Sequence, residues 1–311
     1  MPKYSVEWGG DRGPDVPVRM LTPQKIKHPT PGNNFVSKDL VRRLGRMPSG
    51  AAWLVAEQFA AVDPEGATAH INFIPQLGNG RRESRTGVQF GQMVTNSPSQ
   101  KERAELVAVK PVSPYAAARE FGAMSVMNGL ARLRPDGRGR SFTPLGFYRS
   151  PEGGQVSLIT RYEHQVVTLD NLLWDESEKP ISELRVRAAL SHTALALADA
   201  HASGFIHGDP QPKNIGTDNI GYRYPDLEAA SEFEVQPGVV DPFRARRLIE
   251  EELDTALRTL DGDYTDLVPD SFAEIYHDNV AEAIPSEAIL TTKDIIAIAN
   301  RPQYPIHHYG A

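Results

Sequence analysis

The chain has 311 residues, of which 40% are hydrophobic, and a formal net charge of −7. It is long enough for two lobes or domains and has the composition of an ordinary globular protein. It contains no cysteine, which excludes disulfides, thiolate catalysis and cysteine-based metal sites. The net negative charge argues against sequence-independent nucleic-acid binding through the whole surface, so nucleic acid is not an indicated partner.

No run of apolar residues is long enough for a membrane span, and no charged-then-apolar leader follows Met1. We therefore expect a cytoplasmic protein. The charge is uneven: residues 1–50 hold nine Lys/Arg against four Asp/Glu, and residues 231–311 hold sixteen Asp/Glu against six Lys/Arg. The basic arm is expected to meet an acidic partner or the protein's own tail. An incidental charge bias on solvated faces is the alternative.

The N-terminal region has two parts. Residues 1–35 carry many Pro and Gly and little periodicity, so we expect them to be extended or partly disordered. The stretch from Ser37 to Gly45 begins with a capping-type serine and ends at glycine, which predicts a short helix. Residues 1–50 are therefore predicted to form an N-terminal extension.

Three segments that follow alternate like strands, namely residues 69–74, 86–94 and 105–110. They predict three antiparallel strands, whereas the apolar run at 51–56 fits a helix or a strand equally well. Between the first two segments, Gly78 and Gly80 would let backbone N–H groups approach phosphate. An ordinary hairpin turn is the alternative at that place.

The third strand ends in a lysine and leads into a predicted helix. Lys110 closes the run Val-Ala-Val-Lys, and Ser113 and Pro114 have the residue types of an N-cap and a first helical position. Glu120 then lies two turns inside the helix. The simplest interpretation is a strand-end lysine and a helix glutamate that are both solvated.

Further along, residues 144–149 and 156–162 flank a turn at 151–154 and predict a hairpin. Residues 182–203 are rich in Ala and Leu and are followed by Gly204, which predicts a helix.

After this helix comes a loop with an acid, a carboxamide and a second acid. Asn214 follows Asp209 by five residues, and Asp226 comes twelve residues later. Such a trio can support phosphoryl transfer, because one carboxylate can accept the proton of an attacking hydroxyl. The carboxamide and the second carboxylate can then hold a divalent metal against nucleotide phosphates. A polar surface turn followed by an exposed acid is the alternative.

These residues carry a resemblance to a known family. His207, Asp209 and Asn214 match the H-x-D-x-x-x-x-N catalytic loop of the protein-kinase-like superfamily, and Asp226 stands where its metal-binding aspartate belongs. Lys110 matches the lysine of its V-A-I-K strand. The resemblance covers roughly residues 70–260 and is greatest to the atypical branches, such as the aminoglycoside phosphotransferases, lipopolysaccharide kinases and RIO kinases.

The resemblance implies a two-lobed α+β fold. Residues 51–162 would form a small antiparallel β lobe, and residues 163–311 would form a mostly helical large lobe with a compact C-terminus. The reaction would transfer the γ-phosphoryl group of ATP, with Mg²⁺, to a hydroxyl of a protein or small-molecule acceptor. A nucleotide-binding pseudokinase and a nucleotidyl transferase remain alternatives.

The resemblance also implies a role for each site residue. Asp209 would be the catalytic base, and Asn214 and Asp226 would bind the metal. Lys110 would contact the α- and β-phosphates, and Glu120 would hold this lysine in place. The remaining nucleotide contacts would come from the backbone, at Gly78 and Gly80 for phosphate and at a hinge over residues 161–163, centred on Tyr162, for adenine.

The chain departs from the family pattern in several places. Gly208 replaces the usual arginine, and Leu227 and Glu228 replace the Phe and Gly of the metal-binding motif. Gln211 stands where many protein kinases have a phosphate-contacting lysine, for which Lys213 is the nearest substitute. No A-P-E motif follows. Helices are predicted instead over residues 242–260, 271–283 and 292–299.

Overall fold

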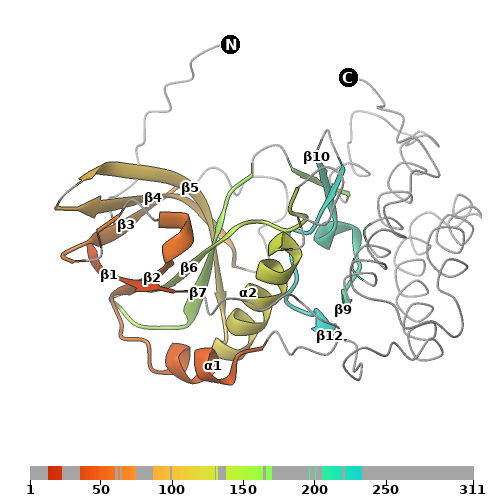
Figure 1. Cartoon of the computed structure of the whole chain (residues 1–311), viewed down its shortest axis with the longest axis horizontal. Coiled ribbons are helices and arrows are strands. Elements are labelled where there is room, and N and C mark those ends of the chain that lie inside the picture. Colours follow the sequence, from red (N-terminus) through yellow and green to blue (C-terminus); the bar gives the residue numbers. More distant parts are fainter. Residues whose placement is uncertain are drawn as a thin grey trace, which may run out of the picture. The chain divides into compact units, whose positions relative to one another are not determined.

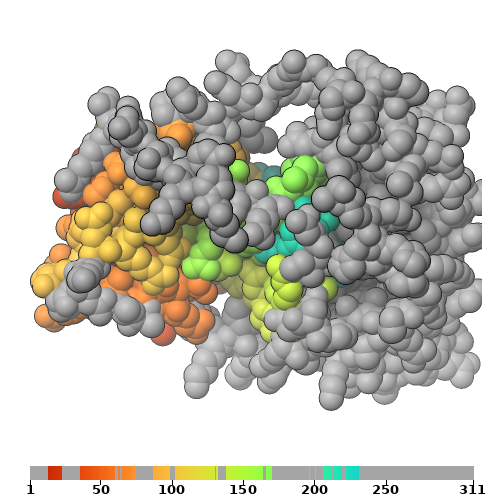
Figure 2. Space-filling model, turned by 90° about the horizontal axis from the view of Figure 1, so that it is seen from above, coloured from red at the N-terminus to blue at the C-terminus, as the bar shows by residue number. Residues whose placement is uncertain are grey.

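A computed structural model of the chain is shown in Figure 1, and in Figure 2 the described residues are coloured and the others are grey. The structure describes residues 13–22, 36–59, 62–63, 65–74, 87–98, 100–129, 131, 138–163, 166–169, 196, 200, 205–218 and 221–232. The chain divides into two compact units. We call them the barrel unit, which includes residues 36–121 and 143–162, and the second unit, which includes residues 122–142 and those after Tyr162.

The barrel unit is built from seven strands that close on themselves (Figure 1). In barrel order they are β1 (Val16–Leu21), β2 (Ala51–Val55), β6 (Pro144–Arg149), β7 (Val156–Arg161), β5 (Gln100–Val112), β4 (Gln89–Ser97) and β3 (Thr68–Phe73). The β1–β2 pair is parallel and every other neighbouring pair is antiparallel. Closure matters because it leaves no row of unpaired backbone groups at a sheet edge.

The barrel encloses an apolar core, because alternate residues of a strand point to opposite faces. In β1, Val16 and Val18 are buried while Pro17 and Arg19 are exposed. The buried core cluster also contains Ala52, Leu54, Phe59, Val62, Ala67, Ala69, Ile71, Met93, Val107, Val109, Leu145, Tyr148 and Ile159. The interior is therefore filled by side chains, as in other small barrels.

The predicted fold class is wrong. We expected a two-lobed fold with a small antiparallel β lobe and a mostly helical large lobe, but a closed barrel is the main element of the described residues, and α1 and α2 are their only complete α-helices. The prediction missed β1, which lies in the segment assigned to an N-terminal extension. Its pairing with β2 on one side and β3 on the other turns an open sheet into a closed one.

The helices predicted over residues 182–203, 242–260, 271–283 and 292–299 lie outside the described residues, apart from Ala196 and Ala200. Of the N-terminal stretch 1–35, the structure describes only residues 13–22, which contain β1.

Several local predictions are confirmed. Helix α1 spans Lys38–Gly45, and Ser37 caps it by accepting a hydrogen bond from the Leu40 N–H at 3.2 Å. The alternating segments form the antiparallel strands β3, β4 and β5, and the ambiguous run at 51–56 is mostly strand β2, followed by a 3₁₀ helix, Ala56–Phe59. The predicted hairpin is β6–β7.

Helix α2, Pro114–Gly129, begins where predicted, since the Ala116 N–H donates to the Ser113 hydroxyl at 3.2 Å. Its first half belongs to the barrel unit, where Phe121 contacts Phe147 of β6 with ring centroids 5.1 Å apart.

The second unit contains two small sheets among its described residues. In the three-stranded sheet, β10 (Gly216–Asp218) lies between β8 (Val167–Thr168) and β11 (Gly221–Arg223). In the two-stranded sheet, β9 (Phe205–Ile206) pairs with β12 (Ser231–Glu232). The β9–β12 pair places the loop after β9 next to the segment that precedes β12. Both carry residues that the sequence marked as candidate site residues.

Candidate active site

The barrel unit contains an ion pair between Lys110 and Glu120. The Lys110 Nζ lies 3.2 Å from Glu120 Oε2 and 3.4 Å from Oε1. Lys110 lies two residues before the end of β5, and α2 starts two residues after the end of that strand, so two helical turns place Glu120 beside the lysine. This is the contact that the sequence suggested for these two residues.

Burial makes this pair unusual. The Glu120 side chain is 1% exposed and that of Lys110 is 12% exposed. A carboxylate taken out of water needs a charged or hydrogen-bonding partner, because burying it alone is costly. The Lys110 ammonium provides that charge, and the lysine side chain as a whole is not completely buried. The simple interpretation of two solvated side chains therefore does not hold.

In the second unit, Asp209 and Asn214 lie together in the loop after β9. The Asn214 side-chain nitrogen donates to Asp209 Oδ2 at 2.7 Å and to the Asp209 carbonyl at 3.0 Å. A 3₁₀ helix, Pro212–Asn214, closes the loop and brings Asn214 back to Asp209. Since both of these neighbours are acceptors, the amide must turn its nitrogen toward Asp209 and its oxygen elsewhere.

Asp226 lies in the short segment between β11 and β12. Its Oδ1 accepts the Glu228 N–H at 2.8 Å, and the Ala230 N–H donates to the Leu227 carbonyl at 3.1 Å. The Leu227 side chain is fully buried. Leu227 thus anchors the segment by its burial, while Asp226 is half-buried.

The loops that carry Asp209 and Asp226 are adjacent. Ile206 pairs with Ser231 in the β9–β12 ladder, and Gly208 lies so close to the other loop that a Cβ on it would come within 2.3 Å of the Ala229 carbonyl oxygen. Gly208 also has a φ of +81°, which favours glycine. A glycine at position 208 is thus required by the local geometry.

The predicted phosphate-contacting glycines and the predicted adenine hinge have different outcomes. Gly78 and Gly80 lie outside the described residues. In the predicted hinge, the Arg161 N–H donates to the Thr143 carbonyl and the Tyr162 N–H donates to the Leu106 carbonyl, both at 2.9 Å. These two backbone donors are therefore engaged in barrel hydrogen bonds, and an adenine contact there would have to use other groups.

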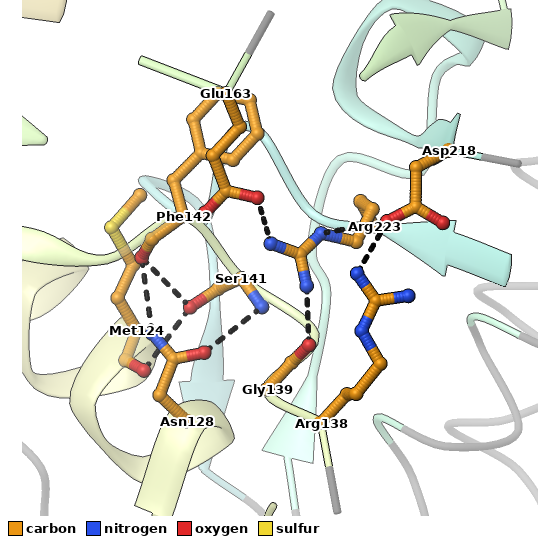
Figure 3. A network of polar contacts seen from close by, with 9 residues as sticks. All are labelled: Met124, Asn128, Arg138, Gly139, Ser141, Phe142, Glu163, Asp218 and Arg223. Carbon is orange, nitrogen blue, oxygen red and sulfur yellow. Dashed lines mark hydrogen bonds and ion pairs between the residues drawn. The ribbon is translucent and has the colours of Figure 1, made fainter. Parts of the chain in front are cut away.

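The sequence analysis missed a buried charge network in the second unit, centred on Arg223 of β11 (Figure 3). Arg223 forms ion pairs with Glu163 and Asp218, and Arg138 forms a second ion pair with Asp218. No local motif marks these residues. Of these, only Asp218 and Arg223 lie in strands, and these strands of three residues each are too short to give a periodic signal.

Comparisons with known proteins add little to this geometry. No protein-family model and no curated protein matches the chain. A solved structure described as WaaP in complex with acyl carrier protein is similar over 65% of this chain and 78% of that chain, with 15% sequence identity and a TM-score of 0.35. A likeness of this size establishes neither fold nor activity. Among the described residues, no helix has the length and apolarity needed to cross a membrane.

Proposed function

We propose that the chain is an ATP-dependent phosphotransferase that moves the γ-phosphoryl group to a hydroxyl of a protein or small molecule. The observation that carries the proposal is the Lys110–Glu120 ion pair, in which the Glu120 side chain is 1% exposed and the Lys110 side chain 12% exposed. A lysine held in this way offers a fixed positive charge to an anion. Nucleotide phosphates are the anions that such a lysine serves in phosphoryl transfer.

The Asp209 loop supplies the second part of the chemistry. The acceptor hydroxyl oxygen bonds to the γ-phosphorus while the bond from this phosphorus to the β,γ-bridging oxygen breaks, and ADP leaves with the electron pair. The hydroxyl proton passes to the Asp209 carboxylate and then to water. Asn214, which donates to Asp209 Oδ2 at 2.7 Å, keeps that carboxylate in one orientation.

The residues fit a magnesium ion. Mg²⁺ prefers oxygen ligands, and Asn214 and Asp226 offer a carboxamide oxygen and a carboxylate. The Asn214 nitrogen is committed to Asp209, which leaves its oxygen available for another partner, and the Glu228 N–H holds one Asp226 oxygen. When bound, the ion supplies positive charge to the phosphate oxygens. The two residues hold it and set its position.

Labelled ATP tests the reaction. With γ-labelled ATP we expect label on an acceptor or on the protein itself, and with α-labelled ATP we expect none. Label from the α position would instead indicate nucleotidyl transfer, and tight ATP binding without any transfer would indicate a pseudokinase. Lys110→Ala should lower turnover and weaken ATP binding, whereas Lys38→Ala, which removes an exposed lysine of α1, should change neither.

Asp209→Asn separates binding from chemistry. We expect near-native ATP affinity, because Asp209 is assigned to the acceptor hydroxyl rather than to nucleotide or metal. Phosphoryl transfer should fall at least about a hundredfold, the usual scale for loss of a general base. Asparagine keeps one acceptor oxygen for the Asn214 amide, so the loop should be preserved. A variant that transfers at the wild-type rate would remove Asp209 as the base.

A further inference from the structure

Arg223 joins three separate parts of the second unit through one guanidinium (Figure 3). Its Nη2 donates to Glu163 Oε2, its Nη1 donates to the Gly139 carbonyl, and its Nε lies 3.9 Å from Asp218 Oδ2. The Arg223 side chain is 7% exposed and that of Asp218 is 5% exposed. This guanidinium is therefore held by two hydrogen-bond acceptors, Glu163 and Gly139, and by a longer ion pair with Asp218.

The network continues beyond Arg223. Arg138 Nη2 donates to Asp218 Oδ2 at 3.1 Å, and its side chain is 34% exposed. The strand segment that carries Asp218 is thus held between two arginines, one buried and one near the surface. The four side chains Arg138, Arg223, Asp218 and Glu163 carry two positive and two negative charges, which balance.

The residue after Arg223 is also fixed. The Tyr224 N–H donates to the Arg140 carbonyl at 2.7 Å, its hydroxyl donates to the Ala196 carbonyl, and its ring contacts the His207 ring with centroids 5.6 Å apart. Tyr224 is completely buried. Asp226 follows only two residues later, so the segment that carries it leaves from a firmly anchored point.

We propose that Arg223 is a positioning residue for Asp226, which sets the affinity of the site for its divalent cation. The inference rests on the proposed function, since it takes Asp226 as a metal ligand. Partners that orient the ligands of a metal commonly change metal affinity by about 10–100-fold when they are altered. Arg223 acts indirectly in this proposal. It is not assigned to the metal or the nucleotide, but it fixes the end of β11, three residues before Asp226.

Stability alone does not account for such a network. A buried ion pair is often no more stabilising than apolar residues of the same size, because taking the charges out of water offsets their attraction. A guanidinium that donates to two fixed acceptors and pairs with a third group favours a single geometry of the segments that carry them. In this chain the fixed geometry of Arg223 constrains the segment that follows it and carries Asp226. We infer that the network has this positioning role in addition to packing.

The test uses two variants of the full chain and one control. Arg223→Lys keeps the charge but lacks the planar guanidinium that donates to Glu163 and Gly139 at once, and Glu163→Gln keeps the shape while removing one charge. Arg149→Lys is the matched control, because Arg149 also donates to two backbone carbonyls, those of Met47 and Gly154, but lies in the barrel unit. Two quantities are measured: the Mg²⁺ concentration for half-maximal transfer at saturating ATP, and amide hydrogen exchange without metal at Glu228 and Ala230.

We expect Arg223→Lys and Glu163→Gln to raise the half-saturating Mg²⁺ concentration about tenfold, while the KM for ATP at saturating Mg²⁺ stays near the wild-type value. Exchange at Glu228 and Ala230 should become faster in both variants, because these amides donate to Asp226 and Leu227. The control should change neither quantity. A general loss of packing would raise the KM and speed exchange throughout, so it would not give this pattern.

Two outcomes overturn the inference. One is a wild-type Mg²⁺ dependence in a folded Arg223→Lys or Glu163→Gln protein, and the other is unchanged exchange at Glu228 and Ala230. Hydrogen exchange also separates this inference from the proposed function, since it needs no nucleotide. Suppose that the wild-type protein transfers no phosphoryl group but that the variants lose protection at these amides. Arg223 then still positions the segment, and only the proposed phosphotransferase activity is rejected. If Arg223→Lys does not fold, Glu163→Gln decides alone.

Discussion

Gly208 is the residue that allows the Asp209 loop to pass beside the Asp226 segment. Its φ of +81° is one that other residues rarely adopt, and the Ala229 carbonyl occupies the space a side chain would need. Neither strand can easily give way, because β9 and β12 pair directly before and after this contact. Replacing Gly208 by alanine would be a conservative change at most surface positions. Here we expect it to alter the geometry of the candidate site.

We therefore predict that Gly208→Ala lowers the free energy of unfolding by about 1–3 kcal/mol, the usual cost of a residue held in a sparsely populated backbone conformation. The measurement is chemical denaturation of the purified protein. Gly45→Ala is the control, because Gly45 ends helix α1 and nothing lies within 4 Å of an added Cβ there. A stability equal to wild type in Gly208→Ala would mean that the two loops are farther apart than the structure has them.

At the scale of elements, the corner between β5 and α2 shows how short-range signals combine. The strand ends at Val112, and two residues later Pro114 opens the helix with Ser113 as its cap. Both signals are local and legible in the sequence. They are sufficient to bring Glu120 back to Lys110, so this contact between two elements could be predicted although neither residue is conspicuous alone.

Strand β6 carries a titratable group in the barrel core. Burial raises the pKa of the Tyr148 phenol above its ordinary value of 10.0, and the negative charge of Glu152 raises it further. As the pH rises above that ordinary value, the unfolded chain releases the phenol proton while the folded protein retains it. Release of the proton stabilises the unfolded state relative to the folded state, so the free energy of unfolding falls over this alkaline range.

We predict that Tyr148→Phe removes this part of the alkaline destabilisation. Thermal unfolding measured from pH 8 to 11 should show a smaller loss of stability above about pH 10 in the variant than in the wild type. Tyr115→Phe, which removes a phenol that is 53% exposed, should follow the wild-type curve. The same alkaline slope in Tyr148→Phe and the wild type would show that another group causes it.

At the scale of the whole molecule, the parts that the sequence could predict are those with local signals. Alternation identified β3, β4 and β5, and the spacing of Asp209 and Asn214 anticipated a contact that the structure contains. The closure of the barrel could not be foreseen in this way. It depends on β1, whose prolines and surrounding glycines read as loop, and on its pairing with strands more than thirty residues away.

The Arg223 network escaped prediction for a related reason. Arg223 and Glu163 are 60 residues apart, and Arg138 and Asp218 are 80 apart. Whether a charged residue is solvated or buried in such a network depends on which distant segments fold over it. A single sequence contains no periodicity that reports this. The sequence therefore brought out Asp209, Asn214 and Asp226 as candidate site residues, while the Arg223 network could not be found in it.

The last prediction concerns the stability of the whole chain. A ligand that binds only the folded state stabilises it, by about 2.7 kcal/mol at a hundred times its dissociation constant. ATP with Mg²⁺ should therefore raise the unfolding temperature, and ATP with a chelator should raise it less. Asp226→Ala and Asp226→Asn should both lose the magnesium-dependent part. The comparison is between shifts, because alanine also removes the acceptor of the Glu228 N–H, which asparagine retains.

Asp39→Asn, at an exposed ion pair on α1, serves as the control and should keep the full magnesium-dependent shift. If Asp226→Asn keeps that shift as well, Asp226 is not a metal ligand, and the carboxylate would have only its local role of holding the Glu228 amide. If the shift is lost in both Asp226 variants and kept in Asp39→Asn, the magnesium-dependent stabilisation requires the negative charge of Asp226. The loss would then connect a single side chain to the stability of the entire chain through the bound nucleotide.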